Sequence, residues 1–283
     1  MNDINLYWST DKTLHVLGCM NPNISQIISK NDYWYIIKHL RFENYNDETI
    51  DKTYKAWKVK EIIELFRNRC IDMLPCPGMR ISVDEGMIQA SQITCPIAQH
   101  IPNKPIKRGI KLYMAVDQET SIVFNFHLED GRISADNSRE FRYGATGRHV
   151  IELLQRLPGI GYEVYADNYY GSLALAAYLL NVLQMYLICT WRRNRGVPRC
   201  LIMSDAKAPK PSTKWHKGSI TYAYCKNNIT LRLQKGWIYA YGYMDSGLVF
   251  LIDSKYGPLQ TGIMNRKRSD GTLEPNEVPI YCA

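Results

Sequence analysis

The spacing of apolar residues changes near position 79. Before it, apolar side chains recur at helical spacing, and after it they form short runs separated by turn residues. Residues 32–42 (DYWYIIKHLRF) place Trp34, Ile37 and Leu40 near one face, behind Asp32, a residue type that often caps helices. This segment therefore predicts an amphipathic helix that begins at the aspartate.

A second and clearer helical pattern covers residues 57–74. Its apolar residues are expected on one side, with lysine and glutamate opposite, and they are Ile62, Ile63, Leu65, Phe66 and Met73. Proline and glycine at 75–78 end the pattern. We therefore expect residues 1–79 to be a helical region.

The middle of the chain alternates strand and helix patterns. Strands are predicted at 80–88, 111–117, 122–128, 162–167 and 185–190. Helices are predicted at 149–157 and 172–183, the second with Ser172 as its cap. The first three strands can form an antiparallel meander with the first strand central, and the crossover helices make the last two strands parallel. The order β-β-β-α-β-α-β predicts an α/β fold with an RNase H-like mixed sheet over residues 80–190.

A basic and then β-rich segment follows the predicted core. Strand patterns recur at 220–232, 238–243 and 249–253, so residues 191–265 are expected to form a C-terminal β-rich insertion. Residues 266–283 are expected to return to the core.

Two aspartates interrupt apolar strands. Asp84 lies in ISVDEGM and Asp167 in VYADNYY, and a carboxylate inside a buried strand costs several kcal/mol unless a cation or donor offsets it. In the expected topology the two strands are parallel neighbours, so the acids should face one another and could share magnesium or manganese. The alternative is that both acids only cap strand ends through backbone N–H groups or pair with nearby arginines. Glu85 should point to the other face, and Asp117 and Asp253 are assigned to turns and strand ends.

The positive charge is concentrated in one segment. The chain carries a net charge of +8 with a pI near 9.0. Residues 191–217 contain one acid, Asp205, and eight basic residues, which are Arg192, Arg193, Arg195, Arg199, Lys207, Lys210, Lys214 and Lys217. This density favours contact with a polyanion such as nucleic acid over the alternative of a solvated basic face.

Composition narrows the class of protein further. No apolar run approaches the roughly 18 residues that a membrane helix needs, and the N-terminal residues lack the layout of a secretory signal. The eight cysteines include no CxxC pair, so the sequence signals neither a zinc knuckle nor a disulfide framework. We therefore expect an intracellular protein without a membrane partner.

Several blocks of sequence resemble the piggyBac transposase family along nearly the whole chain. They are RFENYNDE at 41–48, DKTYKAWKV at 51–59, SVDEGMI at 82–88, IPNKPIKRGIKLYM at 101–114, YGATGRHVIELL at 143–154, VYADNYYGSLALAAYLL at 164–180 and TWRRNRGVP at 190–198. The block at 101–114 is long enough to be highly specific for the family.

The resemblance implies a cut-and-paste DNA transposase or a host protein derived from one. It implies a nuclear protein that binds double-stranded DNA at transposon ends as a homodimer, without a small-molecule substrate. Asp84 and Asp167 match the first two catalytic, metal-binding aspartates, which use Mg²⁺ or Mn²⁺. The candidate DNA-binding residues in the matching blocks are Lys104, Lys107, Arg192, Arg193 and Arg195.

The sequence also departs from the family pattern. A basic, glycine-bearing stretch after the first aspartate is replaced by ASQIT at 90–94, and His100 stands where tyrosine is usual. Cys189 replaces a glycine, and Gly171 replaces a small hydroxyl residue. The sequence printed here stops near the position of the family's third catalytic aspartate, so we expect weak or vestigial metal binding.

These departures leave three interpretations. The leading one is a transposase-derived DNA-binding protein without cleavage activity, because its set of three aspartates is incomplete. The second is a fragment of an active transposase that carries out magnesium-dependent strand cleavage and transfer. The third is a non-catalytic dimerisation or interaction module.

Overall fold

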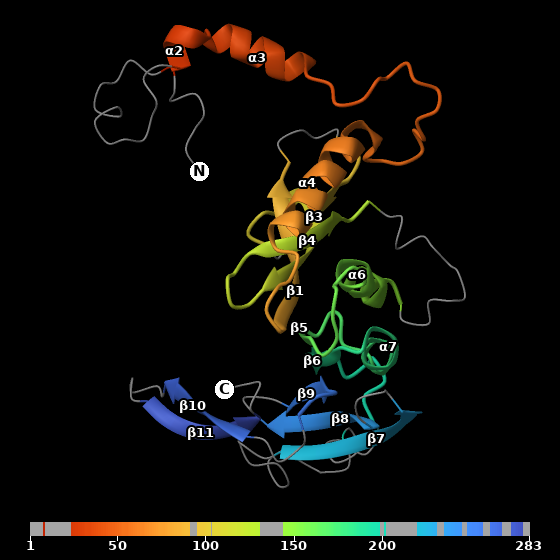
Figure 1. Cartoon of the computed structure of the whole chain (residues 1–283). Coiled ribbons are helices and arrows are strands. Elements are labelled where there is room, and N and C mark those ends of the chain that lie inside the picture. The colour runs from red at the N-terminus through yellow and green to blue at the C-terminus, as the bar shows by residue number, and fades with distance from the viewer. Residues whose placement is uncertain are drawn as a thin grey trace. The chain divides into compact units, whose positions relative to one another are not determined.

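The protein is described by a computed structural model (Figure 1). The described residues are Trp8 and residues 24–90, 95–102, 104–130, 144–198, 201, 220–230, 235–244, 248–256, 261–267 and 273–279. The chain divides into two compact units. Unit 1 comprises Met1–Thr53 and Trp57–Ile62, and unit 2 comprises Tyr54–Ala56 and Ile63–Ala283.

Unit 1 contains the helices α2 (Ile24–Ile27) and α3 (Lys30–His39). The predicted helix exists, but the assignment of Asp32 as its cap is wrong. Ser29 is the cap, because its hydroxyl oxygen accepts a hydrogen bond from the Asp32 N–H at 3.1 Å and its O–H donates to the Asp32 carboxylate at 2.6 Å. The serine hydroxyl satisfies one free N–H at the start of the helix, and the Asp32 carboxylate in turn accepts the serine O–H, so the serine three residues upstream is the N-cap.

The second predicted helix consists of a 3₁₀ turn, η2 (Trp57–Val59), followed by α4 (Lys60–Met73). The apolar side expected for this helix is not its buried side. Arg67 is the buried residue of α4, whereas Phe66 and Met73 are 63% and 76% exposed. The reason is tertiary: the Arg67 guanidinium contacts the buried Asn125 of β4 and the partly exposed Glu152 of α6, and these contacts override the hydrophobic pattern.

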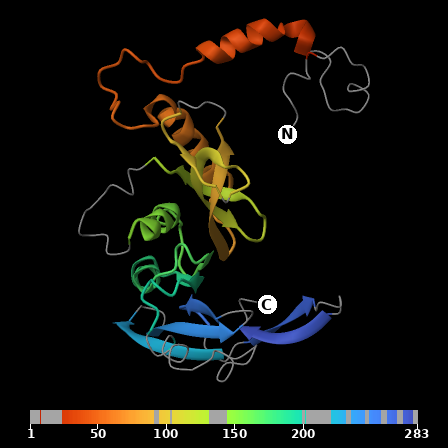
Figure 2. The ribbon, with the colours of Figure 1, turned by 180° about the vertical axis from the view of Figure 1, so that it is seen from behind.

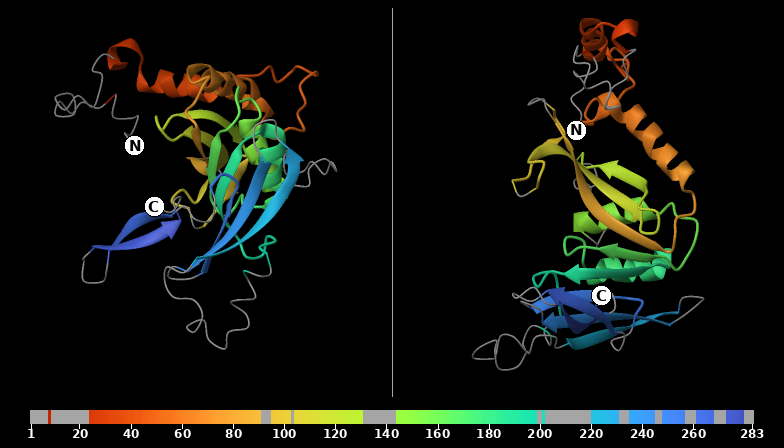
Figure 3. Two further views of the ribbon diagram at one scale, coloured as in Figure 1. Left: turned by 60° about the horizontal axis from the view of Figure 1, so that its bottom comes forward. Right: turned by 90° about the vertical axis from the view of Figure 1, so that its left-hand side faces the viewer.

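A nine-stranded mixed sheet forms the centre of unit 2. Its strands are β1 (Arg80–Gln89), β2 (Ala98–His100), β3 (Arg108–Asp117), β4 (Val123–Leu128), β5 (Glu163–Ala166), β6 (Tyr186–Trp191), β7 (Ile220–Thr230), β8 (Lys235–Met244) and β9 (Leu248–Asp253). They follow one another in the order β2-β3-β1-β5-β6-β9-β8-β7, with β4 also paired to β3 (Figures 2 and 3). The predicted meander, the central first strand and the two parallel neighbours β5 and β6 are confirmed. The short strand β2 was not predicted.

The β-rich segment after β6 extends this sheet. β9 pairs antiparallel with β6, with Ile188 opposite Asp253, and β8 and β7 follow outward. A separate antiparallel pair is formed by β10 (Thr261–Lys267) and β11 (Leu273–Pro279). The three predicted strands are therefore present, while the proposed domain boundaries at 79, 190 and 265 stay predictions.

Two helices connect the parallel strands and pack on the sheet (Figure 1). They are α6 (Gly144–Leu154) and α7 (Leu173–Tyr178), and α7 continues as a π-helical turn, η3 (Leu179–Leu183). Ser172 caps α7, as predicted, because its hydroxyl accepts the Leu175 N–H at 3.1 Å. The core between the helices and the sheet includes Ile81, Val83, Val150, Leu154, Val164, Leu175, Leu179 and Leu187. These contacts hold the carboxyl ends of β1, β5 and β6 at one edge of the fold, where α/β proteins place their sites.

Candidate metal centre and nucleic-acid interface

Asp84 and Asp167 come from neighbouring parallel strands. Val83 of β1 pairs with Ala166 of β5, so the next position on each chain places Asp84 beside Asp167. Both aspartates are exposed, and no strand separates them. Their Oδ1 atoms accept one local backbone N–H each, from Glu85 at 2.7 Å and Tyr169 at 2.8 Å. The adjacency predicted from the strand order is confirmed.

The surroundings of Asp167 disfavour the charged form of its carboxylate. Partial burial raises the pKa of Asp167 above its ordinary value, and the negative charges of Glu85 and Asp84 raise it further. The Tyr169 N–H and the Arg192 guanidinium act in the opposite direction but do not cancel the effect. A cation bound at this edge would stabilise the charged form of Asp167.

Glu85 belongs to a different set of contacts. Strand alternation turns it away from Asp84 and pairs it across the sheet with Tyr113. Its carboxylate lies 3.2 Å from the Lys111 Nζ and 3.6 Å from the Lys104 Nζ, and its side chain is only 10% exposed. Because two ammonium groups hold this carboxylate, it is not an open third ligand.

These donors fit one hard cation. Mg²⁺ and Mn²⁺ prefer carboxylate oxygens and water, and the two neighbouring aspartates supply the former. Within the described part of the chain, no group of three or more His, Cys, Asp or Glu residues could hold a metal ion. Among the described residues, Asp84 and Asp167 are therefore the candidate metal ligands.

Two of the predicted DNA-binding arginines contact the loop that follows β5. Arg192 donates from Nε to the Asn168 Oδ1 at 2.9 Å. Arg195 donates from Nη1 to the Tyr169 carbonyl oxygen and to the Thr146 Oγ1, the latter at 3.3 Å. Arg192 is exposed and Arg195 is half-buried. Arg195 is therefore bound within the fold, whereas Arg192 still faces solvent.

The other predicted DNA-binding residues differ in their surroundings. Lys107 and Arg193 are exposed. Lys104 is half-buried beside Glu85. The remaining basic residues of the charged segment, Arg199, Lys207, Lys210, Lys214 and Lys217, lie outside the described residues. Arg193 and Lys107 are thus the clearest surface cations among the predicted contacts.

Sequence analysis missed two residues of this site. Lys111 Nζ lies 4.6 Å from the ring centroids of both Tyr113 and Tyr169 and bridges to Glu85. Strand alternation could have placed Lys111 and Tyr113 on one face of the predicted strand 111–117, but their pairing with Glu85 depends on the register of β1 and β3. Tyr169 carried no such signal, since the turn after β5 is set by tertiary contacts.

Two of the departures from the family pattern meet in space. A Cβ atom at Gly171 would lie 3.2 Å from the Cys189 Sγ and 2.5 Å from the Thr190 carbonyl oxygen. A side chain at 171 and a thiol at 189 therefore compete for the same volume. The tighter of the two contacts is with the backbone of Thr190, so the glycine is required here by the close approach of β6 as well as by the cysteine.

The remaining strand-end acids have structural roles, as predicted. Asp117 accepts hydrogen bonds from the Gly78 N–H at 3.1 Å and from the N–H and hydroxyl of Thr120 at 3.0 and 2.5 Å. The Thr120 hydroxyl is the main cause of the lowered pKa of Asp117. Asp253 ends β9 and accepts the N–H groups of Lys255 and Tyr256.

No helix in the described part of the chain is long and apolar enough to cross a membrane.

Comparison with known proteins agrees with this geometry. The family model described as Transposase IS4 matches residues 1–254. The fold is similar to that of a piggyBac transposase solved by cryo-electron microscopy as a synaptic complex with hairpin DNA, with a TM-score of 0.66 and 21% sequence identity. The match covers 94% of this chain and 50% of that one, so the chain spans about half the length of the solved transposase. The chain therefore belongs to the transposase family that this model describes.

Proposed function

We propose that this chain is a transposase-derived DNA-binding protein whose Asp84 and Asp167 hold a divalent cation beside a bound duplex. The observation that carries the proposal is the placement of both aspartates at one sheet edge, next to the basic turn that follows β6. The complex of the similar transposase with hairpin DNA supports DNA as the partner.

The two aspartates would act as oxygen ligands. Magnesium or manganese bound there would polarise a phosphodiester oxygen. The Tyr169 and Glu85 N–H groups would keep each carboxylate turned toward its neighbour, since each already occupies one aspartate oxygen. Such a role also places the protein in the nucleus and favours the homodimer that synapsis of two DNA ends would need.

The basic residues would bind phosphates rather than bases. Arg192 and Arg193 follow β6 at the same edge as Asp167, and both are exposed. Lys104 and Lys107 precede β3, whose partner β1 carries Asp84. Contacts of this kind fix a duplex in place and carry little sequence information.

Salt dependence of DNA binding tests this arrangement. The affinity for duplex DNA should fall steeply between low and physiological salt because counterions are released. Reversing the exposed residues Lys107, Arg192 and Arg193 to glutamate should weaken binding roughly tenfold or more for every duplex sequence, by loss of phosphate contacts. Fluorescence anisotropy across a salt series measures both effects.

Arg69→Glu is the matched control for a single charge reversal, because Arg69 is exposed and belongs to α4, outside the segments that carry the predicted DNA contacts. If the triple variant binds duplex DNA with the native affinity and the native salt dependence, the exchanged basic residues form only a solvated face. If Arg69→Glu weakens DNA binding as much as the triple variant does, net charge alone governs binding.

The same polypeptide should bind DNA without cutting it. Holding two cations for phosphoryl transfer takes more fixed oxygen ligands than Asp84 and Asp167 supply, and Glu85 is held by lysines. The assay is strand nicking of a labelled terminal-repeat duplex with Mn²⁺. Nicking that Asp84→Ala and Asp167→Ala both abolish would contradict the prediction and establish the active-transposase interpretation.

A further inference from the structure

We infer that Tyr169 is the centre of a clamp that orients Asp167, and that Lys111 and Arg195 are positioning residues of this clamp. The clamp is defined by Tyr169, Lys111, Arg192 and Arg195. Its consequence for metal binding rests on the proposed function, whereas the clamp itself stands on contacts within the fold.

Three cations surround one phenol ring. The Lys111 Nζ lies 4.6 Å from the Tyr169 ring centroid, and the guanidinium carbons of Arg192 and Arg195 each lie 5.7 Å from it. Each distance is within the range in which a cation is attracted by an aromatic face. Three on a single ring hold that ring far more firmly than a surface tyrosine is usually held.

Two of the three cations, Lys111 and Arg195, are anchored to other elements of the fold, whereas Arg192 is held by Asn168 of the same turn. Lys111 belongs to β3, is 9% exposed, and lies 3.2 Å from the Glu85 carboxylate of β1. Arg195 reaches Thr146 at the start of α6 and also the Tyr169 carbonyl oxygen. The clamp therefore ties the turn after β5 to the sheet on one side and to α6 on the other.

The backbone of the Arg195 turn is fixed as well. The Trp191 indole Nε1 donates to the Arg195 carbonyl oxygen at 3.1 Å, and Trp191 is 4% exposed. The buried Trp191 of β6 thus fixes the backbone position from which the Arg195 side chain extends. This distinguishes Arg195 from Arg193, which is exposed.

The clamp acts on Asp167 through a single hydrogen bond. The Tyr169 N–H donates to the Asp167 Oδ1 at 2.8 Å. Fixing the ring and carbonyl of Tyr169 fixes the direction of that N–H, and the N–H fixes the rotamer of the carboxylate two residues upstream. On the other side, Tyr170 is fully buried and closes the turn onto the core. The carboxylate is therefore held ready beside Asp84 before any ligand arrives.

Amide hydrogen exchange of the metal-free protein tests the clamp directly. Tyr169→Leu and Arg195→Leu should speed exchange of the Tyr169 and Tyr170 amides about tenfold or more, because the ring or its cation is lost. Tyr169→Phe, which keeps the aromatic face, should exchange like the native protein. Arg193→Leu is the matched control and should also leave both amides unchanged. Equal protection in all four variants, or equal loss in the Arg193 control, would overturn the inference, and Arg195→Lys provides a milder variant if Arg195→Leu fails to fold.

Terbium titration then separates the clamp from the metal site. Luminescence sensitised by tyrosine should show Tb³⁺ binding that Asp84→Asn abolishes and that Tyr169→Leu and Arg195→Leu weaken about tenfold. Native affinity in both clamp variants, despite faster exchange, would overturn their positioning role. Native affinity in Asp84→Asn would instead remove the metal site from the proposed function and leave the exchange result to decide the clamp.

Discussion

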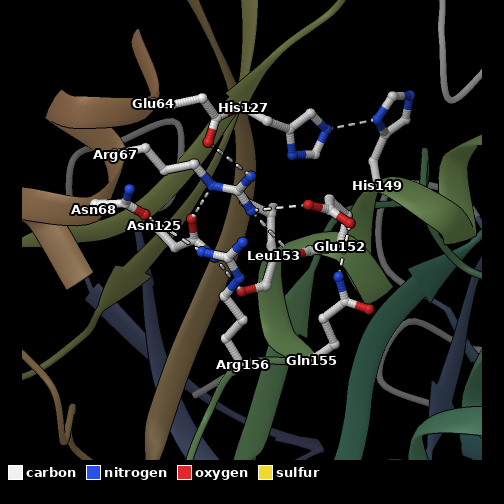
Figure 4. Close-up of polar contacts among 10 residues, drawn as sticks. All are labelled: Glu64, Arg67, Asn68, Asn125, His127, His149, Glu152, Leu153, Gln155 and Arg156. Carbon is white, nitrogen blue, oxygen red and sulfur yellow. Dashed lines mark hydrogen bonds and ion pairs between the residues drawn. The ribbon is translucent and has the colours of Figure 1, made fainter. Parts of the chain in front are cut away.

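Replacing Arg67 by methionine should lower the free energy of unfolding by about 1–3 kcal/mol, because it leaves the buried Asn125 Oδ1 without a donor and removes the ion pair of the partly exposed Glu152. Arg67 is 4% exposed. Its Nε donates to the Asn125 Oδ1 at 2.8 Å, and its Nη2 donates to the Glu152 carboxylate at 3.0 Å (Figure 4). The side chain thereby joins α4 to β4 and α6.

The cost of the substitution follows from what surrounds the guanidinium. Asn125 is itself 1% exposed and donates from Nδ2 to the Leu153 carbonyl oxygen at 2.7 Å, so it cannot turn toward solvent without losing that bond. Glu152 also accepts a hydrogen bond from Gln155 at 2.7 Å (Figure 4). Methionine fills much of the volume of arginine but provides no donor for either group.

Chemical denaturation monitored by circular dichroism measures this effect. Arg69→Met is the matched control on the same helix, and it should change stability by less than about 0.5 kcal/mol because Arg69 is exposed. Adding Glu152→Leu to Arg67→Met should recover part of the loss, since it removes the uncompensated charge. A loss in the single variant no larger than in the control would show that the network does not hold α4.

Asp253 should also make the free energy of unfolding depend on pH. This side chain is fully buried, and burial raises its pKa from near 3.8 to about 7. The folded state therefore binds this proton more tightly than the unfolded state. The resulting stabilisation is complete below about pH 4 and is lost as the pH rises to about 7, a contribution of roughly 3–4 kcal/mol.

Asp253→Asn imitates the protonated carboxyl and still accepts hydrogen bonds from the Lys255 and Tyr256 N–H groups. Relative to the native protein, the variant should gain roughly 3–4 kcal/mol between pH 4 and pH 8. Denaturation at a series of pH values measures the difference. Asp117→Asn should change with the opposite sign, because the pKa of Asp117 is lowered and its stabilisation is lost as pH falls. A pH-independent difference for Asp253→Asn would contradict the buried-acid account.

The strand order was predictable from sequence because it depends on local patterns and chain topology. Apolar runs located β1, β3, β4, β5 and β6, and the RNase H-like order that they match then made β5 a parallel neighbour of β1. The positions of Asp84 and Asp167 followed from that order alone. The Ser172 cap was equally local, since it needs only a hydroxyl three residues before a free N–H.

What the sequence did not reveal depends on long-range partners. Arg67 lies among apolar residues on α4, and only the distant Asn125 and Glu152 make it the buried one. Lys111 and Arg195 likewise contact Tyr169 from elements far apart in the chain. Periodicity describes which face is apolar, but it carries no information on which polar side chain finds a buried partner.

The central claim is that Asp84 and Asp167 together form a cation site. Manganese titration followed by amide NMR tests it most directly, because Mn²⁺ broadens signals only near the ion. The account predicts selective broadening of amides at 83–85 and 166–170, and its disappearance in the Asp84→Asn/Asp167→Asn double variant. Broadening that centres elsewhere, or that persists at these amides in the double variant, would contradict it.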